Sequence, residues 1–247
     1  MVDKHVLLVA QVVREHLNDP DWVVVDCRSE LSDREYGRRS YTENHIPGAV
    51  FLDLDDDLAG PVAPETGRHP LPAVKSIVAT LGAVGIEKSS NVVVYDQGNG
   101  AIAARAWWIL RWLGHESVYL LDGGYSRWQQ LGFPLEAGQV TRDSSQYHES
   151  PGVTRILTTA ALEENLEKLG EHKLLDARDP QRFVGELEPI DPVAGHIPGA
   201  INMPFAEFVS ADGTWLPLEE RTTLLENALG PDRSVDWSVM CGSGVTA

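Results

Sequence analysis

The sequence predicts an α/β protein in which a mainly parallel sheet flanked by helices is built twice in tandem. Three observations carry this prediction. The chain has 247 residues, enough for two domains of ordinary size. Three short motifs of the first half recur in the same order in the second half. In each half, β-branched runs typical of strands alternate with helical runs, and this alternation favours a parallel sheet covered on both faces.

The first half predicts its elements in a regular order. The helical segment "VVREHLND" precedes the strand "VVVDCR", a polar loop that closes on "HIPGA", a helix, and the strand "VVVYD" with its glycine-containing loop. After this loop, "AIAARAWWILRWLG" has apolar residues at helical spacing, with Gly114 in the position that ends helices. The segments "SVYLLDGG" and "YSRWQQLGFPLE" then predict a further strand and a closing helix.

The second half repeats these motifs. "LLDAR" matches the end of the first strand, "HIPGA" recurs at His196 as at His45, and "SVMCGSGV" matches "VVVYDQGNG". The paired positions are separated by 150, 151 and 145 residues, which indicates a tandem duplication. Its opening helix is expected in "TAALEENLEKLG", and the aperiodic polar segment between the copies predicts a linker. We place the domains at 1–137 and 153–247, with the linker at 138–152.

Charge and composition limit the classes of partner. The net charge is −17 and the pI is near 4.7, so neither nucleic acid nor a membrane surface is expected as a partner, because both bind basic patches. No apolar run approaches the roughly 18 residues of a membrane-spanning helix, and no secretory signal pattern opens the chain. Two cysteines exclude a disulfide framework, and a cytoplasmic protein is predicted. The sequence has no metal-site spacing of Cys and His, so neither a metal nor a cofactor is expected.

Cys241 follows an expected strand and precedes a loop with two glycines, residues 242–244. Free backbone N–H groups in such a loop bind anions and lower a thiol pKa from its usual value of about 8.5, which makes Cys241 the predicted nucleophile. The alternative is a buried structural thiol. The matching residue of the first half is Asp96, which has no thiol, so the first domain is predicted to lack this nucleophile. Cys27 is predicted to be structural, because the small residue Ala177 takes its place in the second copy.

These motifs resemble the two-domain rhodanese-like sulfurtransferases, and "CGSGVTA" is the form seen in the 3-mercaptopyruvate sulfurtransferases. The resemblance implies a pair of α/β domains, the first silent and the second carrying a persulfide-forming cysteine, Cys241. It implies transfer of a sulfane sulfur from 3-mercaptopyruvate, or from thiosulfate, to a thiol or cyanide acceptor. The partners would be small molecules, and the oligomeric state is not predicted.

The resemblance also assigns residues that bind the substrate. Arg182, in the "RF" pair, would bind the anionic group of the donor, because a guanidinium matches a carboxylate or sulfonate. The loop after Cys241 has no Lys or Arg for the dianion thiosulfate, so we expect 3-mercaptopyruvate as the preferred donor. The family's second arginine is absent, with Ile190 and Asp191 in that region, so binding of the donor carboxylate is weakened and a high KM is expected. Arg178 recurs as Arg28 in the silent copy, which favours an architectural role. The loop would complete the substrate site through Gly242, Gly244, Val245 and Thr246.

A hydrogen-bonded relay of Asp33, His45 and Ser243 is the last feature that the resemblance implies, and it would position the serine hydroxyl for proton transfer. His45 has a twin in His196, so an architectural role stays equally open. The acid is also open, because four carboxylates precede the histidine: Glu30, Asp33, Glu35 and Glu43.

Two rival enzyme classes fail on the same loop. A cysteine phosphatase would need an arginine at position 247, where the chain has Ala247, and a nucleotide P-loop would need Gly-Lys-Ser/Thr. A non-catalytic binding or regulatory module in which both copies are silent stays open.

The second copy ends early. From Asp96 to Leu135 the first copy runs on for 39 positions, whereas 6 residues follow Cys241. We therefore expect a natural chain of about 280 residues that continues as a helix from Ala247 and supplies the missing C-terminal part of the second domain.

Overall fold

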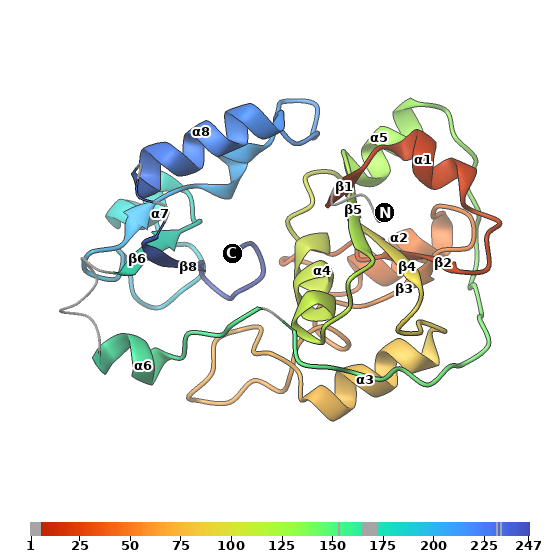
Figure 1. The fold of residues 1–247 in the computed structure, drawn as a ribbon, viewed down its shortest axis with the longest axis horizontal. Coiled ribbons are helices and arrows are strands. Elements are labelled where there is room, and N and C mark those ends of the chain that lie inside the picture. The colour runs from red at the N-terminus through yellow and green to blue at the C-terminus, as the bar shows by residue number, and fades with distance from the viewer. Residues whose placement is uncertain (1–5, 153, 165–171, 231, 233) are drawn as a thin grey trace. The chain divides into compact units, whose positions relative to one another are not determined.

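The computed structural model describes residues 6–152, 154–164, 172–230, 232 and 234–247. The chain divides into two compact units, which are described separately (Figure 1). Unit 1 comprises Met1–Arg155 with Ala211–Thr214, and unit 2 comprises Ile156–Ser210 with Trp215–Ala247.

Unit 1 contains a five-stranded parallel sheet in the order β1-β5-β4-β2-β3. Its strands are β1 (Leu7–Leu8), β2 (Trp22–Asp26), β3 (Val50–Phe51), β4 (Asn91–Tyr95) and β5 (Val118–Leu121). The valine runs of the central strands, 23–25 and 92–94, are buried throughout. Continuous apolar runs of this kind are typical of a parallel sheet covered on both faces, as the sequence predicts.

Helices flank this sheet. They are α1 (Ala10–Glu15), α2 (Tyr36–Glu43), α3 (Val74–Ala83), α4 (Ala103–Trp112) and α5 (Gly124–Gln130). Val13 of α1 and Trp128 of α5 are fully buried in one cluster with Val93 of the sheet, and Figure 1 shows α1 and α5 together, away from α3. Gly114 adopts φ +75° just after α4, as the helix-ending position in the sequence predicts.

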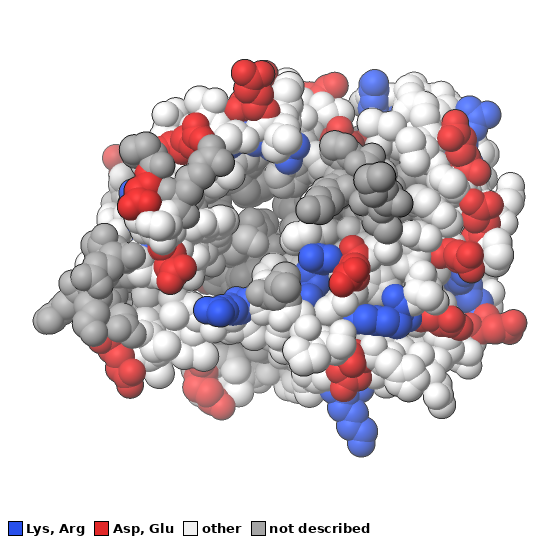
Figure 2. Space-filling view, in the orientation of Figure 1, with Lys and Arg blue, Asp and Glu red and all other residues white. Residues whose placement is uncertain are grey.

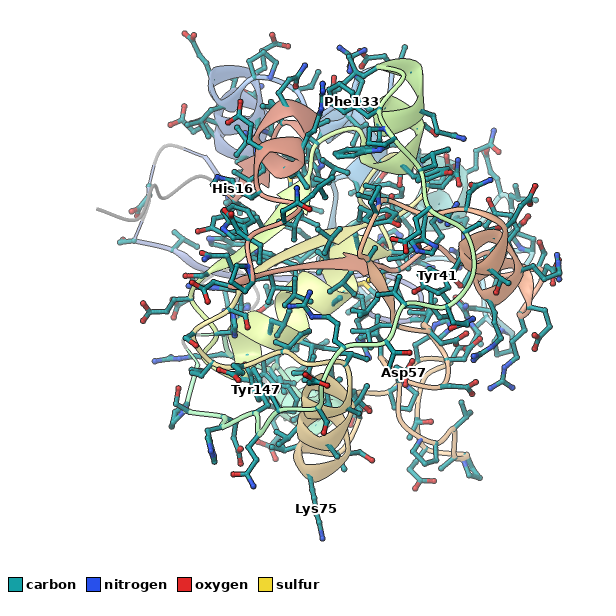
Figure 3. All side chains as sticks on the ribbon, turned by 90° about the vertical axis from the view of Figure 1, so that its right-hand side faces the viewer. His16, Tyr41, Asp57, Lys75, Phe133 and Tyr147 are labelled. Carbon is teal, nitrogen blue, oxygen red and sulfur yellow. The ribbon has the colours of Figure 1, made fainter. Side chains whose placement is uncertain are left out.

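The segment predicted as a linker, 138–152, is bonded along unit 1. Its N–H groups reach carbonyls of the unit at 2.9 Å from Gly138, 2.8 Å from Ser145 and 3.2 Å from Gly152. Tyr147, which is labelled in Figure 3, is 3% exposed. Its ring stacks on the His115 ring at 5.9 Å. The segment is therefore bonded to unit 1 rather than free in solvent, and it forms neither a helix nor a strand of its own.

Unit 2 contains a three-stranded parallel sheet in the order β7-β6-β8. Its elements are α6 (Thr159–Glu164), β6 (His172–Asp176), α7 (Pro180–Val184), β7 (Ile201–Asn202), a 3-10 helix (Phe205–Phe208), α8 (Leu218–Leu229) and β8 (Asp236–Met240). This order matches β3-β2-β4 of unit 1, as a duplication predicts. The end of the expected opening helix, after Glu164, lies outside the described residues.

No helix within the described ranges is both long and apolar enough to cross a membrane. Acidic and basic side chains are interspersed on the face in Figure 2.

Candidate active site

Cys241 directly follows β8, at the carboxyl edge of the unit 2 sheet. β6 and β8 pair in parallel with Asp176 opposite Met240, and Ala177 donates its N–H to the Met240 carbonyl at 2.9 Å. Cys241, the half-buried Gly242 and the segment after β6 therefore lie at one edge of the sheet. The carboxyl ends of parallel strands are where open α/β sheets commonly bind ligands.

The loop after Cys241 directs backbone N–H groups at the thiol. The Gly244 N–H donates to Sγ at 3.1 Å, and Gly244 has φ +73°, which glycine adopts without strain. Burial raises the pKa of the Cys241 thiol. Hydrogen bonds from the Thr246 hydroxyl and from the N–H groups of Ser243, Thr246 and Gly244 lower this pKa by more than burial raises it, so the net shift is downward. Val245 is 4% exposed and anchors the loop. This loop favours the thiolate, the form that acts as a nucleophile.

Cys27 lies in the opposite environment. It is fully buried, and burial together with the charges of Asp26, Asp96 and Asp57 raises the pKa of its thiol well above the usual value. A buried thiol that resists ionisation is unreactive, so the structural interpretation of Cys27 is confirmed.

Asp96 occupies the matching loop of unit 1 and is 3% exposed. Its Oδ1 accepts N–H bonds from Gly98 at 2.9 Å and Gly100 at 3.0 Å, and its Oδ2 accepts from Ile102 at 2.9 Å and Ala103 at 3.1 Å. The last two donors belong to the start of α4. The N–H groups that would bind a foreign anion are therefore occupied by the chain's own carboxylate.

The Asp-x-Arg motifs do the same work in both units. Arg28 holds the aspartate two residues before it through Nε at 2.9 and 3.1 Å and donates to the Asn44 carbonyl at 2.5 Å. Arg178 holds its aspartate through Nε at 3.0 and 3.1 Å and donates to the Gly195 carbonyl at 2.7 Å. Both carbonyls directly precede the histidine of "HIPGA". The arginine thus joins two motifs of its own unit, which is the architectural role expected for Arg178.

The two "HIPGA" histidines also share one arrangement. His45 stacks on Tyr41 at 4.2 Å, and its Nδ1 lies 2.8 Å from the Tyr41 carbonyl. His196 stacks on Phe183 at 3.7 Å, and its Nδ1 lies 2.7 Å from the Phe183 carbonyl. A carbonyl only accepts, so Nδ1 carries the proton in both rings. A contact repeated in both copies supports the architectural role for His45, and its relay with Ser243, a residue of the other unit, stays a prediction.

Asp33 lies away from His45. Its carboxylate is exposed and accepts from Arg39 at 2.6 Å, and this bond is the main cause of its lowered pKa. The carboxylate near His45 is Glu136, with Oε2 3.9 Å from the His45 Nε2. The structure therefore does not bring Asp33 and His45 together, because Asp33 is held by an arginine of its own loop and helix.

A histidine–carboxylate pair that the sequence reasoning missed lies elsewhere in unit 1. His69 is 7% exposed, and its Nε2 lies 3.3 Å from Asp55 Oδ1. Its buried Nδ1 has no hydrogen-bond partner. Burial lowers the pKa of His69, while the Asp55 charge opposes that shift, so the ring is neutral with one free acceptor nitrogen. The signal was present in the sequence: "GRHPLP" has no counterpart histidine in the second copy, whereas "HIPGA" has one.

Arg182 lies on α7, a helix that begins with Pro180 and is capped by the Asp179 carboxylate at 2.8 Å from the Gln181 N–H. Its guanidinium is already ion-paired. It donates to Glu188 through Nε at 3.1 and 3.2 Å and through Nη2 at 2.8 Å. The same Nη2 donates to Asp191 at 2.7 Å.

Within the described part of the chain, no three His, Cys, Asp or Glu side chains gather in a way that could hold a metal ion.

Comparison with known proteins gives one consistent result. Residues 9–131 and 158–247 match the rhodanese-like domain family. The chain is 48% identical over 244 residues to a Pseudomonas aeruginosa protein described as a probable 3-mercaptopyruvate sulfurtransferase, covering 98% of this chain and 85% of the relative. It is 41% identical over 227 residues to a Mycobacterium tuberculosis protein named "Putative thiosulfate sulfurtransferase SseB", covering 91% of this chain and 78% of the relative.

Comparison with solved structures leads to the same family. The structure is similar to that of SseA from Escherichia coli, described for the rhodanese fold and catalytic mechanism of the 3-mercaptopyruvate enzymes, with a TM-score of 0.86 and 30% identity. The match covers 98% of this chain and 90% of that one.

Proposed function

The chain belongs to the rhodanese-like family of sulfurtransferases, and from this premise we propose that it carries a sulfane sulfur from 3-mercaptopyruvate, as a persulfide on Cys241, to a thiol or cyanide. The observation that supports this proposal most directly is the Cys241 loop, in which three backbone N–H groups and one hydroxyl hold the thiolate at the carboxyl edge of the sheet. Small-molecule donors and acceptors fit a site of this kind.

In the first half of the reaction, the Cys241 thiolate attacks the sulfur of 3-mercaptopyruvate. A sulfur–sulfur bond forms, the carbon–sulfur bond breaks, and its electron pair leaves as the enolate of pyruvate. The proton of the donor thiol ends on the enolate carbon, which yields pyruvate and a deprotonated persulfide. The loop N–H groups stabilise the anionic sulfur before and after this step.

In the second half, an acceptor attacks the outer sulfur of the persulfide. Cyanide takes that sulfur as thiocyanate, and the sulfur–sulfur electron pair returns to Cys241 as a thiolate. Charge is conserved, because one anion enters and one leaves. No cofactor or metal is required by either half.

The proton transfer in the first half needs a group that accepts and returns a proton near neutral pH. We assign this role to the hydroxyl of Ser243, which stands in the Cys241 loop two residues after the nucleophile, as the family resemblance implies. The test is Ser243→Ala, which is expected to lower kcat for transfer of sulfur to cyanide while the persulfide on Cys241 still forms. An unchanged kcat in this variant would remove the assignment.

Thiosulfate is the second candidate donor, supported by the name of the 41% identical relative. The loop after Cys241 has no Lys or Arg to bind a dianion, which favours 3-mercaptopyruvate. The deciding measurement is kcat/KM for both donors with cyanide as acceptor. A higher value for thiosulfate would reverse the order.

A non-catalytic rhodanese-like module is the third possibility and makes a different prediction. The enzyme forms a persulfide when incubated with donor, seen as a mass gain of one sulfur that dithiothreitol or cyanide removes. A module would show no such gain on Cys241.

We further propose that the protein acts in the cytoplasm without nucleic acid or membrane partners, on the basis of its two unpaired cysteines and its acidic charge.

A further inference from the structure

Five charged side chains form one connected network at the start of α7. Arg178 pairs with Asp176 at 2.7 Å and approaches Glu188 at 3.5 Å. Arg182 pairs with Glu188 at 2.8 Å and with Asp191 at 2.7 Å. Two guanidinium groups thus face three carboxylates, and the network carries one net negative charge.

The two carboxylates on Arg182 are held differently. The Glu188 side chain is 5% exposed and takes a bidentate hold on the guanidinium. It also accepts the backbone N–H groups of Ile190 at 3.1 Å and Asp191 at 2.9 Å, and its pKa is lowered to about 2, chiefly by Arg182. Glu188 is therefore part of the loop framework. The Asp191 side chain is 21% exposed and bonds Arg182 through one oxygen.

The surrounding loop offers no second cation. Between Arg182 and His196 the sequence has neither Lys nor Arg, and the exposed side chains of this stretch include four apolar ones: Val184, Leu187, Ile190 and Val193. A donor carboxylate that approaches Arg182 therefore finds a charged network with one net negative charge, and apolar side chains are exposed on the surrounding loop. The bonds of Arg182 to Glu188 and Asp191 use Nε and Nη2. A donor carboxylate that binds both terminal nitrogens of the guanidinium therefore needs the Nη2 bond that Asp191 now takes, because Glu188 is fixed by its backbone bonds.

We propose that Asp191 is a specificity-determining residue that acts as an internal competitor of the donor, occupying the guanidinium position that the carboxylate of 3-mercaptopyruvate takes on Arg182. This inference rests on the proposed role of Arg182 in donor binding. The displaced Asp191 side chain moves into solvent, where a carboxylate is well hydrated. The exchange of one carboxylate for another raises KM without changing the chemistry at Cys241. A donor that lacks a carboxylate or sulfonate cannot replace Asp191, so its binding gains nothing from Arg182.

The test is steady-state kinetics of Asp191→Asn, with 3-mercaptopyruvate as donor and cyanide as acceptor. The amide keeps the size of the side chain and removes its charge, so KM is expected to fall roughly three- to tenfold while kcat stays within about twofold. Asp191→Ala should give the same direction. The matched control is Glu186→Gln, which removes the same charge from the same loop at an exposed residue with no bond to Arg182.

Three results would overturn the inference: an unchanged or higher KM in Asp191→Asn, an equal fall in Glu186→Gln, which would indicate general electrostatics, or a fall in kcat that accounts for the change. Arg182→Ala separates this inference from the proposed function. If Arg182→Ala raises KM and Asp191→Asn does not lower it, the competitor role is wrong and donor binding by Arg182 stands. If Arg182→Ala leaves KM unchanged, donor binding by Arg182 fails first, and the competitor role falls with it.

Discussion

Asp96→Asn is the variant whose effect can be worked out most fully from the structure. The amide keeps one oxygen, which can still accept from Gly98 and Gly100, and replaces the other by an NH2 group. That group faces the N–H groups of Ile102 and Ala103, which now lose their acceptor. Two bonds to a charged acceptor are lost at about 1.5 to 2 kcal/mol each, and donor faces donor at a site that is 3% exposed. We expect unit 1 to lose about 3 to 5 kcal/mol.

The assay is urea unfolding followed by tryptophan fluorescence, because five of the seven tryptophans belong to unit 1. With a slope of about 2 kcal/mol per molar urea, the midpoint of the unit 1 transition should fall by about 1.5 to 2.5 M. The matched control is Asp56→Asn, which makes the same chemical change at an exposed ion pair with Arg34 and should cost less than about 1 kcal/mol. Equal midpoints for the two variants would refute the reasoning.

A second variant tests whether the loop is an anion site that Asp96 fills. Asp96→Gly removes the carboxylate and leaves its four N–H donors free. Sulfate or thiosulfate should then restore part of the lost stability of unit 1, in proportion to the logarithm of its concentration, and should have no comparable effect on the wild type. Equal stabilisation of both proteins by the salt would contradict the idea of an occupied site.

Three further outcomes are expected. Cys241→Ser should abolish transfer of sulfur to cyanide while Cys27→Ser keeps most of it, measured as thiocyanate formed, and retained activity in the first variant would remove the mechanism. Thr246→Val should raise the pKa of the Cys241 thiol, because burial opposes ionisation of this thiol and the hydrogen bond from the Thr246 hydroxyl is the largest contribution that favours it. The rate of persulfide formation rises with pH as the thiolate forms, so this acidic limb of the pH profile should move to higher pH in the variant. An unmoved limb would exclude that bond. Arg182→Ala should lower kcat/KM by the roughly 1.5 to 3 kcal/mol of a charge-assisted hydrogen bond, about 10- to 150-fold, by initial-rate kinetics.

The repeated architecture could be predicted from sequence because it depends on local signals. The valine runs of β2 and β4 are buried as a parallel sheet requires, and the helix after the Asp96 loop ends before Gly114. The place of Cys241 also follows from local order, since a strand and a glycine-containing loop define the turn on which it stands. The segment at 138–152 was harder, because its hydrogen bonds depend on the surface of unit 1 and leave no periodicity in its own sequence.

The sequence could not predict which side chains from distant positions in the chain form pairs. Four carboxylates stand near His45 in the chain, yet none of these four bonds it, whereas the buried His69 lies 3.3 Å from Asp55, which is 14 positions away in the sequence. That pairing depends on how the loop between residues 55 and 69 returns on itself, which no local pattern specifies.

By itself, the sequence determined the duplication, the strand and helix order, and the glycine-containing loop that carries Cys241 in one copy and Asp96 in the other, because each depends on residue type, spacing and the comparison of one half with the other. Only the tertiary structure decided which charges meet. It showed Asp96 bonded to four N–H groups, Arg178 joined to the carbonyl before His196, and Arg182 already shared by Glu188 and Asp191. The physical reason is that a hydrogen bond or ion pair needs atoms within about 3 Å, and that distance is set by backbone paths between residues rather than by their order in the chain.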